Sequence, residues 1–227
     1  MKNAILILKS VAGTLFLMLI MGVALFLPFG SLKYSLAWLY LAVFFLSVSI
    51  ITIYLFLFDK HLLKSRLAVG PVAETKPTQK LIQSIAGLAF ISIFIVSALD
   101  YRHKWSNVPL HFSHLGDTFC GLAFVFLFFV FKQNTYLSAT IEVQEKQQVI
   151  STGLYAVIRH PMYTAALLLL IFTPIALGSY WGMIPVAILT TVIVARAIDE
   201  EQELRKNLVG YEAYCRKVKY RLVPFIF

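Results

Sequence analysis

Residues 160–195, HPMYTAALLLLIFTPIALGSYWGMIPVAILTTVIVA, contain no Asp, Glu, Lys or Arg. As one straight helix this stretch would extend for about 54 Å, whereas the hydrocarbon core of a bilayer is about 30 Å thick. Pro174, Gly178 and Pro185 interrupt its middle. We therefore predict a hairpin of two membrane-embedded helices that turns near residues 178–182. Its two ends would return to one membrane face.

Four further apolar runs precede the hairpin, at residues 10–32, 34–58, 81–99 and 118–131. The last is short, and a snorkelling Lys132 would extend it. The chain has 227 residues, of which 59% are hydrophobic and 14% charged, which excludes a disordered chain and disfavours a soluble domain. We predict an all-α fold, a polytopic transmembrane helical bundle with about six membrane-embedded helices, a C-terminal helical hairpin and a cytoplasmic tail. Without a long internal repeat, one membrane domain over residues 1–227 is the simplest organisation.

The charges are distributed unevenly along this topology. The loop at residues 59–80 carries five basic residues, so the positive-inside rule places it in the cytoplasm together with both termini. Of the 20 Lys and Arg, three then lie outside (Lys33, Arg102 and Lys104) and 17 lie inside or at the inner boundary. This sidedness accounts for the net charge of +9 with the bilayer as partner and no nucleic acid. The prediction is a multi-pass protein of a bacterial inner membrane or the endoplasmic reticulum, its oligomeric state open.

Polar chemistry is expected where the two ends of the hairpin meet. At its start, GLYAVIRHPMY (residues 153–163), Pro161 suits a first helical turn, and a helix N-terminus attracts anions. Arg159 adds a planar cation and His160 a donor, while Tyr155 and Tyr163 offer aromatic faces for an adenine ring or a cation. The alternative is that Arg and Tyr here are ordinary anchors at the membrane boundary.

At the other end, RAIDEEQEL (residues 196–204) places Arg196 and Glu200 on one helix face. Glu200 and Glu201 lie about one turn from the apolar boundary, where acidic residues are costly and indicate function. Such carboxylates can accept hydrogen bonds from ribose hydroxyls or an ammonium group. The alternative is a solvated helix with weak ion pairs.

Other site classes find little support. Cys120 and Cys215 form no disulfide framework and are expected to be packing residues. His111 and His114 lack the further ligands that a metal site needs, so no metal is expected. A glycine-rich phosphate loop and a nucleophile elbow are both missing, which disfavours a soluble Rossmann-type site.

Together these motifs resemble the isoprenylcysteine carboxyl methyltransferase family, which overlaps with the bacterial phospholipid methyltransferases. The resemblance covers about residues 143–227. It rests on Gly153-x-Tyr155, Arg159-His160-Pro161-x-Tyr163, the hairpin, Glu200-Glu201-x-x-Leu204, Gly210-Tyr211-x-x-Tyr214 and Arg221-x-x-Pro224.

The resemblance implies an integral membrane methyltransferase that uses S-adenosylmethionine at the cytoplasmic face. Residues 1–135 would supply four transmembrane helices, and residues 136–227 the cofactor-binding catalytic region. The implied catalytic residues are Glu200, Glu201 and Arg196, the last matching the family only approximately, as a group that orients the acceptor. The acceptor would be lipophilic and carry a carboxylate, amine or thiol. The implied cofactor contacts are Gly153, Tyr155, Arg159, His160, Pro161, Tyr163, Glu200, Glu201, Tyr211 and Tyr214.

A rival resemblance points to another reaction. The tail Tyr214-Cys215-x-x-Val218-x-Tyr220-Arg221-x-x-Pro224 is similar to the end of membrane sterol reductases, which use NADPH and also carry a His-Pro-x-Tyr element. Those enzymes usually continue with Gly-Asp, whereas Thr164-Ala165-Ala166 follows here, so we expect the methyltransferase. A transporter or scaffold would leave the Glu pair and the His-Pro element unexplained.

Overall fold

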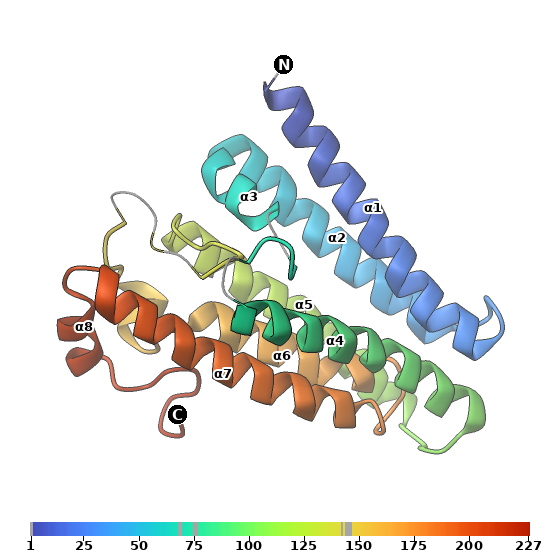
Figure 1. The fold of residues 1–227 in the computed structure, drawn as a ribbon. Coiled ribbons are helices and arrows are strands. Elements are labelled where there is room, and N and C mark those ends of the chain that lie inside the picture. Colours follow the sequence, from blue (N-terminus) through green and yellow to red (C-terminus); the bar gives the residue numbers. More distant parts are fainter. Residues whose placement is uncertain (1, 68–69, 75–76, 142, 144–146) are drawn as a thin grey trace.

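The computed structural model describes residues 2–67, 70–74, 77–141, 143 and 147–227. Apart from one isolated bridge between Ile158 and Tyr220, every regular element in these ranges is helical, which confirms the predicted all-α fold. The elements are α1 (Lys2–Phe29), α2 (Ser35–Phe58), α3 (Lys60–Leu67), α4 (Pro77–His103), α5 (Leu110–Gln133), the 3-10 helix η1 (Gly153–Ala156), α6 (Pro161–Ala176), α7 (Met183–Asn207) and α8 (Tyr211–Lys217) (Figure 1).

Four helices, α1, α2, α4 and α5, are long and apolar enough to cross a membrane, which confirms the predicted polytopic bundle. Helix α6 has 16 residues, a length of about 24 Å, and α7 carries charges over its last part. The predicted hairpin is therefore present as α6 and α7. That both of its helices lie within the bilayer remains a prediction.

The hairpin turns where its glycines and a buried acid of α4 meet. Gly178 has a φ of 72°, a conformation that a side chain would strain. The Asp100 carboxylate accepts hydrogen bonds from the Ser179 hydroxyl at 2.5 Å and from the Trp181 backbone N–H at 3.2 Å. The turn is thus tied to the end of α4.

Helix α6 is held against α5 at very close range. A Cβ atom at Gly116 would lie 2.5 Å from the backbone nitrogen of Ala176, so only glycine permits this approach. From α2, Tyr40 shares a hydrogen bond of 3.0 Å with the Thr173 hydroxyl, and Tyr34 donates to the Leu177 carbonyl. These contacts fix the axis of α6, and with it the position of the residues at its start.

Helix α3, the segment between α5 and α6, and α8 lie at the same end of the bundle (Figure 1). The C-terminal tail is joined there to the start of α6 by backbone hydrogen bonds. The N–H of Arg159 donates to the Tyr220 carbonyl and that of His160 to the Arg221 carbonyl, each at 2.9 Å. The Thr164 hydroxyl adds a bond of 2.6 Å to the Leu222 carbonyl. Residues distant in sequence therefore enclose one space.

Candidate active site

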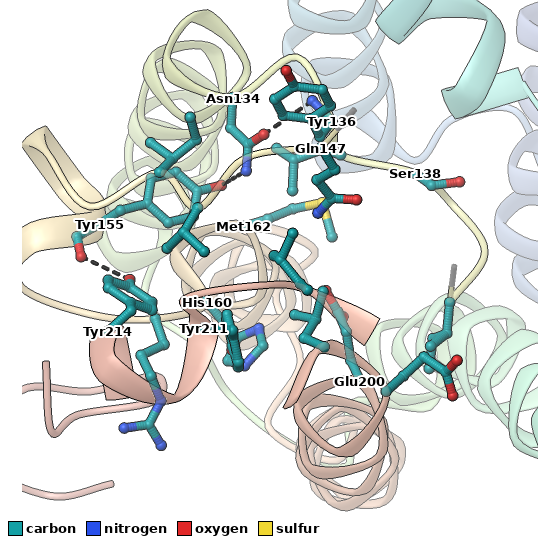
Figure 2. Close-up of a pocket in the computed structure, with 18 of the residues that line it drawn as sticks. Asn134, Tyr136, Ser138, Gln147, Tyr155, His160, Met162, Glu200, Tyr211 and Tyr214 are labelled. Carbon is teal, nitrogen blue, oxygen red and sulfur yellow. Dashed lines mark hydrogen bonds between the residues drawn. The ribbon is translucent and has the colours of Figure 1, made fainter. Parts of the chain in front are cut away.

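A pocket lies at this end, with an empty volume of about 780 Å³ that includes space open to solvent. Its walls come from the segment after α5, from η1, from the start of α6, and from α7 and α8. Figure 2 shows the polar residues Asn134, Tyr136 and Gln147 on one side, with Tyr155 and Tyr214 along another.

One wall depends on the glycine that begins η1. Gly153 has a φ of 58°, and a Cβ atom there would lie 2.6 Å from Gln133 Oε1. That oxygen accepts a hydrogen bond of 2.9 Å from the Leu154 N–H, so η1 is docked on the end of α5. The docking positions Tyr155, whose hydroxyl accepts from Asn134 Nδ2 at 3.0 Å and whose carbonyl accepts from the Tyr214 hydroxyl at 2.7 Å (Figure 2).

Glu201 lies behind the pocket within a cluster of cations. Its carboxylate accepts from Arg159 Nε at 2.6 Å and from Arg221 Nε at 3.2 Å, and His160 Nε2 lies 3.3 Å away. Burial alone would raise the pKa of this carboxyl, but the bonds from His160 and Arg159 outweigh burial and hold the pKa at about 2, below its ordinary 4.5. Glu201 is therefore a structural anion that joins α7 to the start of α6 and to the tail.

Arg159 forms hydrogen bonds within the same cluster, although it also lines the pocket. Besides its bond to Glu201, it donates from Nη1 to the carbonyl oxygens of Val218 and Lys219 at 2.8 and 2.9 Å. Arg159 therefore shares the Glu201 carboxylate with Arg221 and ties the start of α6 to the tail.

Glu200, the neighbour of Glu201, faces the pocket itself. Its carboxylate accepts a hydrogen bond of 2.6 Å from the Tyr163 hydroxyl, and a second acid, Glu203, also lines the pocket. The Tyr211 hydroxyl is buried and has no hydrogen-bond partner among the described residues. The pocket thus presents the Glu200 carboxylate together with a hydroxyl that a ligand can satisfy.

The predicted site residues separate into three groups. Gly153, Pro161 and Glu201 support the walls without lining the pocket. Arg196 lies elsewhere, where it donates to Gln79 Oε1 at 3.0 Å, to Glu74 Oε1 at 2.8 Å and to the Ala139 carbonyl at 2.7 Å. The residues that do line the pocket are Tyr155, Arg159, His160, Tyr163, Glu200, Tyr211 and Tyr214.

Sequence reasoning missed the wall formed by the segment after α5. This wall includes Asn134, Tyr136, Gln147 and Gln148, and Met162 at the start of α6 was also missed. The available signal was a polar stretch rich in amides between two apolar runs, on the same predicted side as the two motifs.

Comparison with known families supports a methyltransferase. The model of the phospholipid methyltransferase family matches residues 112–209, from the first turn of α5 to just beyond the end of α7. The predicted resemblance to this group is confirmed for that stretch, which supplies most of the pocket and excludes Tyr211 and Tyr214. The match and the four long apolar helices support a membrane methyltransferase.

Similarity to a reductase is also found. The chain is 30% identical over 91 residues to the Delta(14)-sterol reductase TM7SF2 of Mus musculus. The aligned part is 39% of this chain and 22% of the reductase, so the chain spans about a fifth of that relative's length.

Proposed function

We propose that the chain is an S-adenosylmethionine-dependent methyltransferase that methylates a lipophilic acceptor at the cytoplasmic membrane face. The observation that carries the proposal is the Glu200 carboxylate on the wall of the pocket. Its hydrogen-bond partner is the neutral Tyr163 hydroxyl, whereas Arg159 is paired with Glu201. A carboxylate on the wall favours a sulfonium and an ammonium group, and it disfavours the phosphates of NADPH.

The lining residues fit this cofactor. Glu200 would face the sulfonium or amino group. The Tyr211 hydroxyl, which has no hydrogen-bond partner among the described residues, would bond to a polar atom such as a ribose oxygen. The rings of Tyr155 and Tyr214 would hold the adenine. Arg159, His160 and Glu201 would keep the tail closed on the site, with Gly153 and Pro161 shaping the backbone around it.

The bound cofactor would supply a methyl group whose carbon–sulfur bond breaks as the acceptor atom bonds to the carbon, the electron pair remaining on sulfur. The protein would mainly align the methyl donor and the acceptor. Such alignment can lower the activation free energy by about 7–11 kcal/mol. A carboxylate or thiolate acceptor needs no base. A protonated amine must first lose a proton, which Glu200 would accept, with Tyr163 orienting the carboxylate.

A second candidate is an NADPH-dependent membrane reductase. The similarity to a Delta(14)-sterol reductase favours it. Because NADPH carries phosphates, this function would require positive potential in the pocket, and Glu200 would oppose binding. The two candidates therefore predict opposite effects of removing the Glu200 charge.

Titration calorimetry of the protein in lipid nanodiscs tests the proposal. S-adenosylmethionine should bind, NADPH should not, and Glu200→Gln should weaken S-adenosylmethionine about tenfold, as expected for one charged hydrogen-bonding partner. Glu212→Gln is the matched control, because Glu212 is exposed on α8 and pairs only weakly with Arg216 at 3.4 Å. Binding of NADPH that becomes tighter in Glu200→Gln would establish the reductase instead.

A further inference from the structure

A second cavity lies beside the pocket, between α4, α5, α6 and α7. Its empty volume is about 1,030 Å³, which includes open space. Its walls are largely apolar, with Ala86 from α4, Leu127 from α5, Ala166 from α6 and Val192 from α7. Such walls suit a hydrocarbon chain.

Two charged residues, Arg66 and Arg196, are among the described residues that line this cavity. Arg196 is compensated by Glu74 at 2.8 Å. Arg66, on α3, donates to the Ser138 carbonyl at 2.9 Å and to Met162 Sδ at 3.4 Å, and lies 5.5 Å from the centre of the Phe131 ring. Within the described ranges, Arg66 forms no ion pair with a carboxylate.

Within the described residues, Arg66 is therefore a cation without a carboxylate at ion-pair distance. Burial lowers the pKa of its guanidinium, and the nearby charge of Arg196 lowers it further, although Tyr163 and Glu200 oppose the change. An anion bound to Arg66 in this cavity would relieve the cost of burying its charge.

The cavity and the pocket share a wall. Met162 and Tyr163 line both spaces, and Arg66 contacts Met162 directly. Tyr163 in turn donates to Glu200 on the pocket side. A group held by Arg66 would thus lie next to Met162 and Tyr163, which separate this cavity from the pocket assigned to the methyl donor.

We propose that Arg66 binds the anionic group, a carboxylate or a phosphate, of an amphiphilic acceptor whose apolar chain fills the cavity between α4, α5, α6 and α7. This assignment rests on the proposed function and narrows its acceptor. A simple alkyl amine or a neutral thiol lacks the anion, whereas a lipid that combines an amine with a phosphate retains it. Arg66 lies outside residues 112–209, so the family match does not include it.

Binding of three oleyl amphiphiles to the protein in phosphatidylcholine nanodiscs tests the assignment, with empty nanodiscs as the blank. Oleate, oleyl phosphate or both should bind at least about tenfold more tightly than oleyl alcohol, since charge-assisted hydrogen bonds are the strong ones. A preference for oleate alone identifies a carboxylate, and a preference for oleyl phosphate alone a phosphate. Equal binding of all three would overturn the assignment.

Variants of Arg66 separate recognition from folding. Arg66→Gln should lose the preference for anions while still binding oleyl alcohol, and Arg66→Lys should keep part of it, because the charge remains and the planar fork is lost. Unchanged anion preference in Arg66→Gln refutes the role of Arg66.

If Arg66→Gln fails to fold, Arg66→Lys tests the recognition of the anion and Ala166→Leu tests the assignment of the apolar chain to the cavity. Ala166→Leu narrows the cavity and should weaken all three amphiphiles, whereas Ala12→Leu on the exposed face of α1 should change none. Unaltered binding in Ala166→Leu would contradict the assignment of the chain to this cavity.

Failure of the two proposals can be distinguished. Arg66→Gln should still bind S-adenosylmethionine, because Arg66 does not line the pocket assigned to it. If the wild type binds no S-adenosylmethionine but prefers anions through Arg66, the proposed function falls and the anion site stands. If it binds S-adenosylmethionine without any anion preference, only the anion site falls.

Discussion

At the scale of single residues, two adjacent acids have opposite surroundings. Glu201 is enclosed by Arg159, His160 and Arg221, whereas Glu200 faces the pocket with one hydrogen bond from Tyr163. The sequence identified both acids, because carboxylates near an apolar boundary are unusual. It could not separate their roles, because Arg159, His160 and Arg221 lie 42, 41 and 20 positions from Glu201 and meet it only in the fold.

The cations around Glu201 predict a pH dependence of stability. Its pKa is about 2 in the folded protein against an ordinary 4.5, so its contribution is complete above pH 4.5 and is lost as the pH falls through 2. For this buried side chain the pKa shift corresponds to a contribution of at most about 3 kcal/mol to the free energy of unfolding. Thermal unfolding should show Glu201→Gln clearly less stable than wild type at pH 7, with a difference that shrinks below pH 4.5. A difference independent of pH would refute this account.

At the scale of elements, the hairpin was predictable and its surroundings were not. Residues 160–195 form a charge-free run that is too long for one membrane span and is interrupted at Gly178. Two antiparallel helices, α6 and α7, are the simplest structure for such a run. The pocket wall formed within residues 134–141 and 147–150 and the role of Arg66 were not identified. Neither belongs to a motif with its own spacing, and both acquire their role only through packing in the fold.

The close contact of α5 with α6 gives a test at this scale. Gly116→Ala would place a Cβ atom 2.5 Å from a backbone nitrogen that cannot move freely, so stability should fall by about 1–3 kcal/mol. Gly121→Ala is the control on the same helix, because its Cβ atom would lie 3.9 Å from the nearest side-chain atom. Both are compared by thermal unfolding in one detergent. Equal stability of the two variants would show that α5 and α6 are less tightly apposed.

At the scale of the whole molecule, the charges predict an orientation. Trp181, in the hairpin turn, is 50% exposed and belongs to the predicted outer face, whereas Cys215 is on α8 at the opposite end. In sealed cells, an impermeant thiol reagent should label Trp181→Cys in a Cys215→Ser background, and should leave Cys215 of the wild type unlabelled until the membrane is opened. The reverse pattern would invert the topology. Ser179 is a poor probe, because it is fully buried against Asp100.

The central claim is that the pocket around Glu200 serves methyl transfer, and the chemistry itself tests it most directly. The purified protein in nanodiscs made from native lipids should be given S-adenosylmethionine with a deuterated methyl group, and separately NADPH with a deuterated hydride. Mass spectrometry of the lipid extract should find the labelled methyl group in a lipophilic product, at a level that falls in Glu200→Gln and not in Glu212→Gln. Deuterium from NADPH in a reduced lipid, with no labelled methyl group in any product, would contradict the account.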